Sequence, residues 1–273
     1  MPDHSTVKIS FLGDISLNNH YESDAALRSR AFNDISPILQ KSDFVVGNLE
    51  CFCKGKGSNE LKVPRIQTSS EALECLKNLN LGLVSLANNH VYDNLKDGFD
   101  KTCEKLNELD INYMGAGGSV LEASSAFLVD VKGKNVGFLN YVTADTNPSI
   151  PLGAGVYVNE YERNKIVGEI KGLKSQADIV ILLLHWGGDV EGFDYPMREQ
   201  RIDAAAFVDA GADAIIGHHS HTWQPVEVIS GKPVFYSLGN FCFDNIAFGD
   251  RLYYMSSFKS HLVTLMFKDG GDR

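Results

Sequence analysis

The sequence predicts an α/β sandwich made of a mostly parallel sheet and a second sheet that is partly antiparallel. Three features lead to this prediction: short apolar runs rich in β-branched residues, amphipathic stretches that follow them, and two hairpin patterns later in the chain. Strands that are apolar on both faces are typical of a parallel sheet covered by helices. The 273 residues contain no long linker and no internal repeat, so we expect one domain over residues 1–273.

Five apolar runs are the expected strands. They are Val7–Leu12, Phe44–Leu49, Gly82–Ala87, Ile179–Leu184 and Ala214–Ile216. Two hairpins are expected as well, because the tripeptides Lys132-Gly133-Lys134 and Ser230-Gly231-Lys232 each interrupt an alternating apolar segment.

Four helices are expected between these strands. The spacing in Thr68-Ser69-Ser70-Glu71 is that of a capping box, which predicts a helix that runs to about Asn80. The other helical patterns cover Asp97–Leu109, Glu160–Ser175 and Met197–Asp209.

The charge balance excludes one class of partner. Lys plus Arg number 25 and Asp plus Glu number 35, which gives a net charge of −10. Non-specific binding to duplex nucleic acid depends on neutralising phosphates, so we expect no nucleic-acid partner. One basic segment follows Glu50 and contains Lys54, Lys56, Lys62 and Arg65. It is either a mobile basic lip that recruits a small anionic or polyanionic substrate, or a solvated flexible loop.

The N-terminal residues show neither a Lys/Arg-rich start nor an apolar stretch of signal-peptide length. The longest apolar run, Ile179–Leu184, is far shorter than the ~20 residues of a membrane span. We therefore expect no membrane anchor in this chain and a cytoplasmic location. Five cysteines without a repeated spacing predict free thiols in a reducing compartment.

Metal-capable side chains recur directly after the expected strands. In the order of those strands they are Asp14, Glu50, Asn89, His90, His185, His219 and His221. The carboxyl ends of parallel strands share one edge of a sheet, where ligand crevices form. Residues spread over most of the chain are therefore expected to converge on one site.

The donor types in this set indicate the kind of site. Structural zinc sites usually use Cys and His at short spacing, which this set does not resemble. Carboxylate and amide oxygens combined with imidazoles suit Mn, Fe or Zn, often as a pair of ions bridged by one carboxylate. Such a pair binds a phosphate oxygen and lowers the pKa of a water between the ions, and His90 is expected to protonate the leaving group.

Each of these residues also has a structural interpretation. Asp14 can cap a helix, Glu50 can be a solvated strand end, and Asn89 can belong to an Asx turn. His185 can be a buried imidazole that is satisfied by a hydrogen bond. The segment Gly217–His221 favours metal binding more strongly, because three imidazoles within four residues seldom serve packing.

Six segments, in order along the chain, carry a resemblance to a known family. They are Phe11–Asp14, Gly47–Glu50, Ser85–His90, His185–Gly187, Gly217–Glu227 and Tyr236–Phe241, within a region of about residues 7–245. This set resembles the CapA family of bacterial capsule and poly-γ-glutamate synthesis proteins, in the calcineurin-like metallophosphatase superfamily. The resemblance implies a four-layer α/β/β/α sandwich with mixed sheets and two divalent ions at the strand ends.

The resemblance also implies a role for each residue. Asp14 and His221 would bind one ion, Glu50 would bridge both ions, and the second ion would be bound by Asn89, His185 and His219. His90 matches the catalytic histidine, with Asp93 as its orienting partner.

The sequence departs from typical metallophosphatases at Ser16, where a histidine is usual. The first ion is then weakly held, absent, or completed by water or by another residue such as Asn18.

These inferences lead to three hypotheses of function. The first is a metal-dependent hydrolase that acts on a phosphoester or related anionic bond through a metal-activated water. The second, from the resemblance, is biosynthesis or processing of poly-γ-glutamate or a capsule polymer, and the third is a non-catalytic module that binds anionic polymer. Trp186, Trp223 and Phe241 flank the candidate ligands and either wall a substrate pocket or pack in the core.

Overall fold

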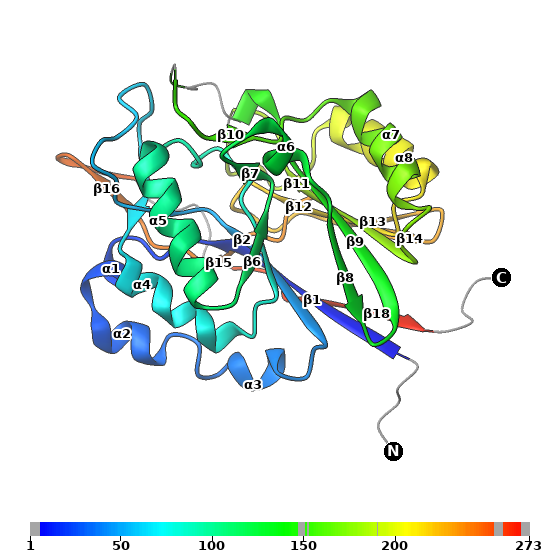
Figure 1. Ribbon diagram of the computed structural model, residues 1–273, viewed down its shortest axis with the longest axis horizontal. Helices are drawn as coiled ribbons and strands as arrows, with labels where there is room; N and C mark the ends of the chain where they lie inside the picture. The colour runs from blue at the N-terminus through cyan, green and yellow to red at the C-terminus, as the bar shows by residue number, and fades with distance from the viewer. Residues whose placement is uncertain (1–5, 147–150, 152, 190, 254–258, 269–273) are drawn as a thin grey trace.

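Two six-stranded sheets form the centre of the protein, whose computed structural model describes residues 6–146, 151, 153–189, 191–253 and 259–268 (Figure 1). The first sheet has the order β15-β1-β2-β5-β6, and β18 also pairs with β1. Its strands are β1 (Thr6–Ile15), β2 (Phe44–Leu49), β5 (Leu83–Ser85), β6 (Asn112–Met114), β15 (Asn240–Cys242) and β18 (Val263–Lys268). All neighbours are parallel except β18, which is antiparallel to β1.

The second sheet has the order β13-β14-β12-β11-β9-β8. Its strands are β8 (Phe127–Val131), β9 (Lys134–Val142), β11 (Ile179–His185), β12 (Ala214–His218), β13 (Val226–Ile229) and β14 (Lys232–Phe235). Its four central strands are parallel, and the antiparallel pairs β8–β9 and β13–β14 are the two expected hairpins. The predicted parallel core with antiparallel additions is therefore confirmed.

The alternation of side chains along the strands divides the interior into three apolar clusters. Phe11 of β1 and Ile181 of β11 belong to the cluster between the two sheets. Their neighbours Leu12 and Leu182 point the opposite way, into the outer clusters under the helices. Successive strand residues face opposite sides of a sheet, so strands that are apolar throughout need helices on their outer faces.

Helices provide those two outer layers (Figure 1). On the first sheet, α4 (Ser70–Leu73), the 3₁₀ helix η1 (Glu74–Leu79) and α5 (Leu95–Glu108) contribute to one outer cluster. On the second sheet, α7 (Arg163–Leu173) and α8 (Arg198–Ala210) contribute to the other. The order helix, sheet, sheet, helix confirms the expected four-layer sandwich.

The helix expected before Asn80 ends where predicted but differs in its geometry. It consists of one α turn followed by a 3₁₀ segment, and it ends at Asn80 in a left-handed conformation with φ of 53°. Its N-cap is Ser69, whose side chain accepts from the backbone N–H of Ala72. Thr68 is not the cap, because its hydroxyl donates to the carbonyl of Leu17 and its backbone pairs in a short strand.

Shorter elements make up the connections between the layers. They are α1 (His20–Ser23), α2 (Ala25–Arg30), α3 (Ser36–Leu39), α6 (Val120–Ser124), η2 (Ala144–Thr146), β3 (Phe52–Cys53), β4 (Gln67–Thr68), β7 (Ala116–Gly117), β10 (Tyr157–Val158), β16 (Ile246–Phe248) and β17 (Arg251–Tyr253). All five cysteines are buried and free, as expected. Within the described ranges, no helix combines the length and the apolar character that a bilayer crossing requires.

Candidate metal centre

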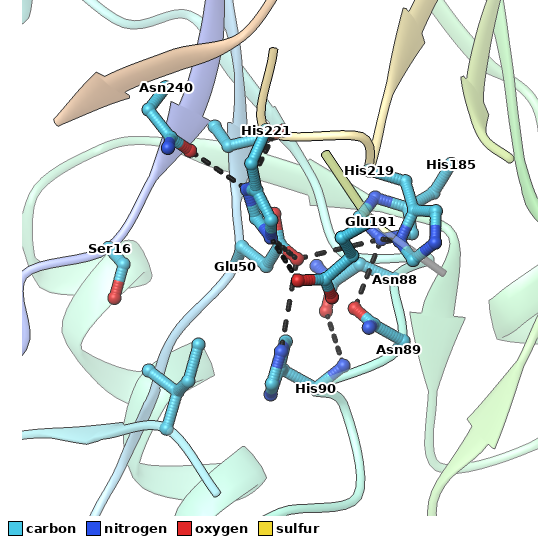
Figure 2. A network of polar contacts seen from close by, with 12 residues as sticks. Ser16, Glu50, Asn88, Asn89, His90, His185, Glu191, His219, His221 and Asn240 are labelled. Atoms are coloured by element: carbon cyan, nitrogen blue, oxygen red, sulfur yellow. Dashed lines mark hydrogen bonds and ion pairs between the residues drawn. The ribbon is translucent and has the colours of Figure 1, made fainter. Parts of the chain in front are cut away.

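The carboxyl ends of the central strands bring the candidate ligands into one buried cluster (Figure 2). Asp14 lies near the end of β1, Glu50 directly follows β2, and His185 is the last residue of β11. Parallel pairing aligns these ends, because Asp14 pairs with Asn48 and His185 with His218. The convergence expected from the sequence is present in the structure.

Gly13 allows β15 to lie against β1 beside the cluster. A Cβ atom at this position would lie 1.9 Å from the carbonyl oxygen of Gly239, so a larger residue would push the two segments apart. The backbone N–H of Asp14 donates to the same oxygen at 2.9 Å. This close approach carries Asn240, the first residue of β15, to the side of His221.

Glu50 occupies the centre of the cluster. Its Oε1 lies 3.6 Å from His185 Nε2, 3.7 Å from His221 Nε2 and 3.9 Å from His90 Nε2. A single carboxylate oxygen thus faces three imidazole nitrogens from three different strand ends. Glu50 therefore lies between two parts of the site, a His185 side and a His221 side.

Asn48 holds the two central carboxylates in place, a function that the sequence did not reveal. Its side-chain amide donates to Asp14 Oδ1 at 2.9 Å and to Glu50 Oε2 at 3.3 Å. The hydroxyl of Ser85 donates to its amide oxygen at 3.0 Å, which fixes the NH₂ group toward the carboxylates. Asn48 lies two residues before Glu50 in the segment Gly47–Glu50, which carries the family resemblance. An asparagine at a strand end has many possible roles, so the sequence alone did not indicate this one.

Two buried carboxylate oxygens at the centre of the cluster, and Asp93 Oδ1 beside it, receive no hydrogen bond from the described residues. Asp14 Oδ2 and Glu50 Oε1 receive none from the described residues, although both side chains are fully buried. A buried acceptor without a partner costs about 1–3 kcal/mol, and more when it is charged. One ligand atom each from Asp14, Glu50 and His185 lies within 4.8 Å of the others, a spacing that a shared cation would satisfy. The donor set therefore fits a divalent metal.

The protonation of the two carboxylates reflects their surroundings. Burial and the neighbouring charge of Asp14 raise the pKa of Glu50 well above its ordinary value. Burial acts in the same direction on Asp14, but the close contact with His221 and the charges of His218 and His221 outweigh it and lower the pKa of Asp14. The ionised Asp14 and the crowded Glu50 are both groups that a bound cation would stabilise.

The His185 side contains the three predicted ligands of the second ion. His185 Nε2 lies 3.0 Å from Asn89 Oδ1 and 3.2 Å from His219 Nδ1. His219 Nε2 lies 2.7 Å from the carbonyl of Gly188, which accepts its hydrogen and leaves the lone pair on Nδ1 facing the cluster. Burial and the nearby histidines lower the pKa of His185 well below its ordinary value, so its ring is neutral and able to bind a metal.

The His221 side joins Asp14 to two residues that the sequence did not single out. His221 Nδ1 lies 3.3 Å from Asp14 Oδ2 and 2.8 Å from Asn240 Oδ1, while its Nε2 lies 3.6 Å from Glu191 Oε2. Burial opposes a charge on this ring, but Glu50 and Glu191 raise the pKa of His221 well above its ordinary value. Glu191 and Asn240 carry no distinctive spacing, so only the folded chain shows that they belong to the cluster.

The backbone of the histidine-rich turn is strained at the site itself. His219 and His221 have φ angles of 100° and 55°. Positive φ is costly for a residue with a side chain and concentrates at functional sites. Such strain is typical of a turn that directs its two imidazoles into a functional site and not into the apolar core.

His90 and Asp93 form a pair beside the carboxylates. His90 Nδ1 lies 2.6 Å from Asp93 Oδ2, which also accepts from the backbone N–H of Ile66 at 2.6 Å. Burial and the positive charge of Lys62 lower the pKa of His90, although Asp93 acts in the opposite direction. The free edge of the ring, Nε2, faces Glu50.

Ser16 and Asn18 turn away from the cluster. The Ser16 hydroxyl donates to Asn18 Oδ1 at 2.9 Å, and the Asn18 amide donates to the carbonyls of Asp244 and Asn245. Figure 2 shows Ser16 apart from the contact network. The structure therefore does not support Asn18 as a substitute for the usual histidine.

The basic segment after Glu50 divides into three cations that pair with acids away from the cluster and one cation that contacts the cluster. Lys54 pairs with Glu22 at 2.5 Å, Lys56 with Asp97 at 3.7 Å and Arg65 with Glu60 at 3.1 Å. None of the contacts described for these three side chains is with the metal cluster.

Lys62 is the member of the segment that reaches the cluster. Its ammonium donates to the backbone carbonyl of Asn89 and lies 3.7 Å from Asp93 Oδ1. Only 13% of the side chain is exposed.

The two tryptophans have different environments. Trp186 is buried, stacks on Tyr236 with ring centroids 5.9 Å apart, and donates its indole N–H to the Tyr236 carbonyl. It belongs to the outer apolar cluster of the second sheet, so Trp186 packs in the core and does not wall a substrate pocket. Trp223 is 49% exposed and packs edge-to-face on His261. Phe241 packs against the outer cluster of the first sheet.

Two proteins of known name resemble this chain in sequence. The protein named PGA biosynthesis protein CapA from Bacillus subtilis (strain 168) is 31% identical over 241 residues, 86% of this chain and 63% of the relative. The capsule biosynthesis protein CapA from Bacillus anthracis is 29% identical over 257 residues, 89% of this chain and 61% of the relative. The chain thus spans about three fifths of the length of these relatives.

Two solved structures share the fold. A hypothetical protein from Thermus thermophilus aligns with a TM-score of 0.53 and 16% identity, over 85% of this chain and 76% of that one. A Staphylococcus aureus protein assigned as a 5′-nucleotidase aligns with a TM-score of 0.53 and 14% identity, over 84% of this chain and 48% of that one. These likenesses concern the fold alone and agree with the layered α/β sandwich described above.

The family described as "Bacterial capsule synthesis protein PGA_cap" matches residues 8–245, which include every ligand candidate described above. The chain belongs to the bacterial capsule synthesis protein family PGA_cap.

Proposed function

We propose that this protein is a metal-dependent hydrolase that cleaves a phosphoester or related anionic bond. The observation that carries the proposal is a pair of buried carboxylate oxygens, on Asp14 and Glu50, that face imidazole nitrogens and receive no hydrogen bond from the described part of the chain. Purely structural carboxylates at a strand end would be solvated or fully hydrogen-bonded. We also propose that both sheets belong to one domain, because each supplies ligands to this cluster.

The residues on either side of Glu50 would hold two divalent ions, of Mn, Fe or Zn. Asn89, His185 and His219 would bind one ion, Asp14 and His221 would bind the other, and Glu50 would bridge them. When bound, such ions polarise a phosphoryl oxygen and make a water nucleophilic near neutral pH. The protein's own contribution is to keep the donors fixed and to exclude bulk water from them.

His90 would act as the general acid. Asp93 accepts the Nδ1 hydrogen, which leaves Nε2 as the atom that holds a proton and gives it to the leaving-group oxygen. Burial and Lys62 lower the pKa of His90 and so favour the neutral ring when no substrate is bound. The negative charge of an arriving substrate favours the protonated ring and so supplies the acid when it is needed.

Lys62 would bind the anionic part of the substrate. It is the cation of the basic segment that lies at the cluster, and it is held there by Asn89 and Asp93. A buried ammonium attracts an anion more strongly than an exposed one, since water screens it less. The other cations of the segment are paired with surface acids and are not required for this role.

A second candidate function follows from the relatives. The B. subtilis relative is named for PGA biosynthesis and the B. anthracis relative for capsule biosynthesis. The same site would then act on an acyl-phosphate, an amide or a chain end during synthesis or processing of an anionic polymer. A third alternative is a module that binds such a polymer without cleaving it.

Hydrolysis is tested with an aryl phosphate and Mn²⁺, comparing wild type with His90→Ala and His219→Ala. Both variants are expected to lose at least about 100-fold in kcat, because general acid catalysis contributes about 10²–10⁴ and a metal ligand is required for the nucleophile. His20→Gln is the control, because His20 is 71% exposed and lies outside the cluster. Equal activity in all four proteins would refute the catalytic assignment.

The polymer functions are separated in the same preparation. Wild type is incubated with poly-γ-glutamate, with and without a chelator, and the polymer is sized. Shortening that requires metal and His90 supports processing of the polymer. Binding that survives chelation, without any change in polymer length, favours the non-catalytic module and rules out both enzymatic alternatives for this substrate.

A further inference from the structure

Glu191 belongs to the cluster although no sequence motif pointed to it. It lies between β11 and α8, and its Oε2 is 3.6 Å from His221 Nε2. Figure 2 shows its carboxylate close to the His221 ring and to Glu50. The side chain is 39% exposed, whereas His221 and Glu50 are almost fully buried, so Glu191 is the member of this group in contact with solvent.

The hydrogen bonding of His221 determines what its Nε2 atom can do. Nδ1 lies 2.8 Å from Asn240 Oδ1, an amide oxygen that only accepts, so Nδ1 carries a hydrogen. In the neutral ring Nε2 then presents a lone pair, and it faces Glu50 Oε1 at 3.7 Å and Glu191 Oε2 at 3.6 Å. A proton on Nε2 would form a strong hydrogen bond with only one of these oxygens, whereas a divalent cation would satisfy all three atoms.

The two distances from His221 Nε2 are close to those between ligands of one ion. Donors bound to one ion at about 2.0–2.2 Å lie about 3–3.5 Å apart in tetrahedral or octahedral geometry. The distances from His221 Nε2 to Glu50 Oε1 and Glu191 Oε2 exceed that spacing only slightly, so small side-chain rotations would bring each oxygen to ligand distance from an ion on Nε2.

The His221 side also needs another donor. Ser16 stands where the resemblance leads one to expect an imidazole, and its hydroxyl is directed to Asn18. Glu191 comes from a different segment, which is fastened to the histidine-rich turn. The backbone N–H of Gly192 donates to the Ser220 carbonyl at 2.9 Å, and the Thr222 hydroxyl donates to the Phe193 carbonyl.

We propose that Glu191 is a ligand of the divalent ion on the His221 side, together with His221 Nε2 and Glu50 Oε1. This inference rests on the metal centre of the proposed function and adds to it a ligand at the solvent-exposed edge. Glu191 thereby takes over the structural task of the imidazole that the chain lacks at position 16.

The test is the number and affinity of Mn²⁺ ions bound by the full chain. Chelator-stripped wild type, Glu191→Gln and Glu191→Ala are titrated with MnCl₂, and free Mn²⁺ is followed by electron paramagnetic resonance. Wild type is expected to bind two ions. In both variants one ion should bind at least about 10-fold more weakly and the other unchanged, since even outer-shell partners of a metal affect affinity about 10–100-fold.

Asp194→Asn is the matched control, because it removes one negative charge from the same segment and Asp194 has no described contact with His221. It should bind both ions as wild type does. Two ions of wild-type affinity in Glu191→Gln and Glu191→Ala would overturn the role of Glu191 and leave the metal centre intact. A wild type that binds no Mn²⁺ and no Zn²⁺ would refute the metal centre itself, and with it the role of Glu191.

Discussion

Asp14 and His221 lie near opposite ends of the family-matched region, yet Asp14 Oδ2 is 3.3 Å from His221 Nδ1. The contact links the first strand of one sheet to the turn after a central strand of the other. It forms because β1 and β12 both end at the same edge of the sandwich. Had these residues been far apart, the proposed reaction centre would not exist.

Removal of metal should lower the stability of the protein. A ligand that binds only the folded state stabilises it by about 2.7 kcal/mol when its free concentration is 100 times its Kd. We therefore expect the Tm in excess EDTA to lie several degrees below the Tm in Mn²⁺. Differential scanning calorimetry measures this directly, and identical Tm values would mean that the cluster binds neither ion.

Asn48→Leu should weaken both the fold and the metal site. The substitution keeps similar volume but removes the donor shared by Asp14 and Glu50. We expect a loss of about 1–3 kcal/mol in the free energy of unfolding, because buried carboxylate oxygens lose their hydrogen bonds. Mn²⁺ affinity should fall about 10–100-fold, the range for partners that orient ligands. Urea unfolding and Mn²⁺ titration are the measurements, with the exposed Asn112→Ala as control; wild-type values for Asn48→Leu would contradict this role.

Asp93→Asn should move the pH dependence of kcat to lower pH. Asp93 raises the pKa of His90 against the effects of burial and Lys62, so losing its charge lowers that pKa further. The general acid must be protonated, hence the rate falls as pH rises through the His90 pKa, and this decline should begin at lower pH in the variant. Metal content should not change. A lower kcat with an unshifted pH profile would limit Asp93 to a structural role.

Lys62→Met should have the opposite effect on pH and a separate effect on binding. Loss of the positive charge removes an influence that lowers the His90 pKa, so the decline in kcat should move to higher pH. The KM for an anionic substrate should rise about 10-fold or more, because a charged hydrogen bond contributes about 1.5–3 kcal/mol. Lys54→Met is the matched control, since Lys54 pairs with Glu22 away from the cluster. Equal KM values in the two variants would exclude Lys62 from substrate binding.

Trp186→Ala and Trp223→Ala should differ in stability. Trp186 is 2% exposed and packs on Tyr236, so truncation should cost about 3–5 kcal/mol. Trp223 is 49% exposed, and truncation there should change stability by about 0.5 kcal/mol or less. Chemical denaturation of both variants gives the two values, and equal losses would mean that Trp186 is not a core residue.

The sequence alone predicted the central strands and the convergence of the side chains that follow them. Apolar runs such as Ile179–Leu184 specify buried parallel strands, and the residue that follows such a run must lie at the sheet edge. The helix before Asn80 was less predictable, because several hydroxyl residues compete there for the capping position. Hydrogen bonding decided in favour of Ser69, since Thr68 is bound to Leu17.

The site was predictable where a residue is tied to a strand end and unpredictable where it comes from an irregular segment. Glu191 lies in no helix or strand whose periodicity would predict the direction of its side chain. Its position depends on the hydrogen bond from the backbone N–H of Gly192 to the Ser220 carbonyl. The charges of Lys54 and Lys62 look alike in the sequence. Only burial and contacts distinguish the surface cation from the one beside His90.

The most direct test of the proposed metal centre is anomalous diffraction from crystals grown with Mn²⁺. Two anomalous peaks are expected, one on each side of Glu50, with the first near His185 and His219 and the second near Asp14 and His221. Absence of any peak within bonding distance of Glu50, in crystals that bind Mn²⁺ elsewhere, would contradict the metal centre and the hydrolytic function derived from it.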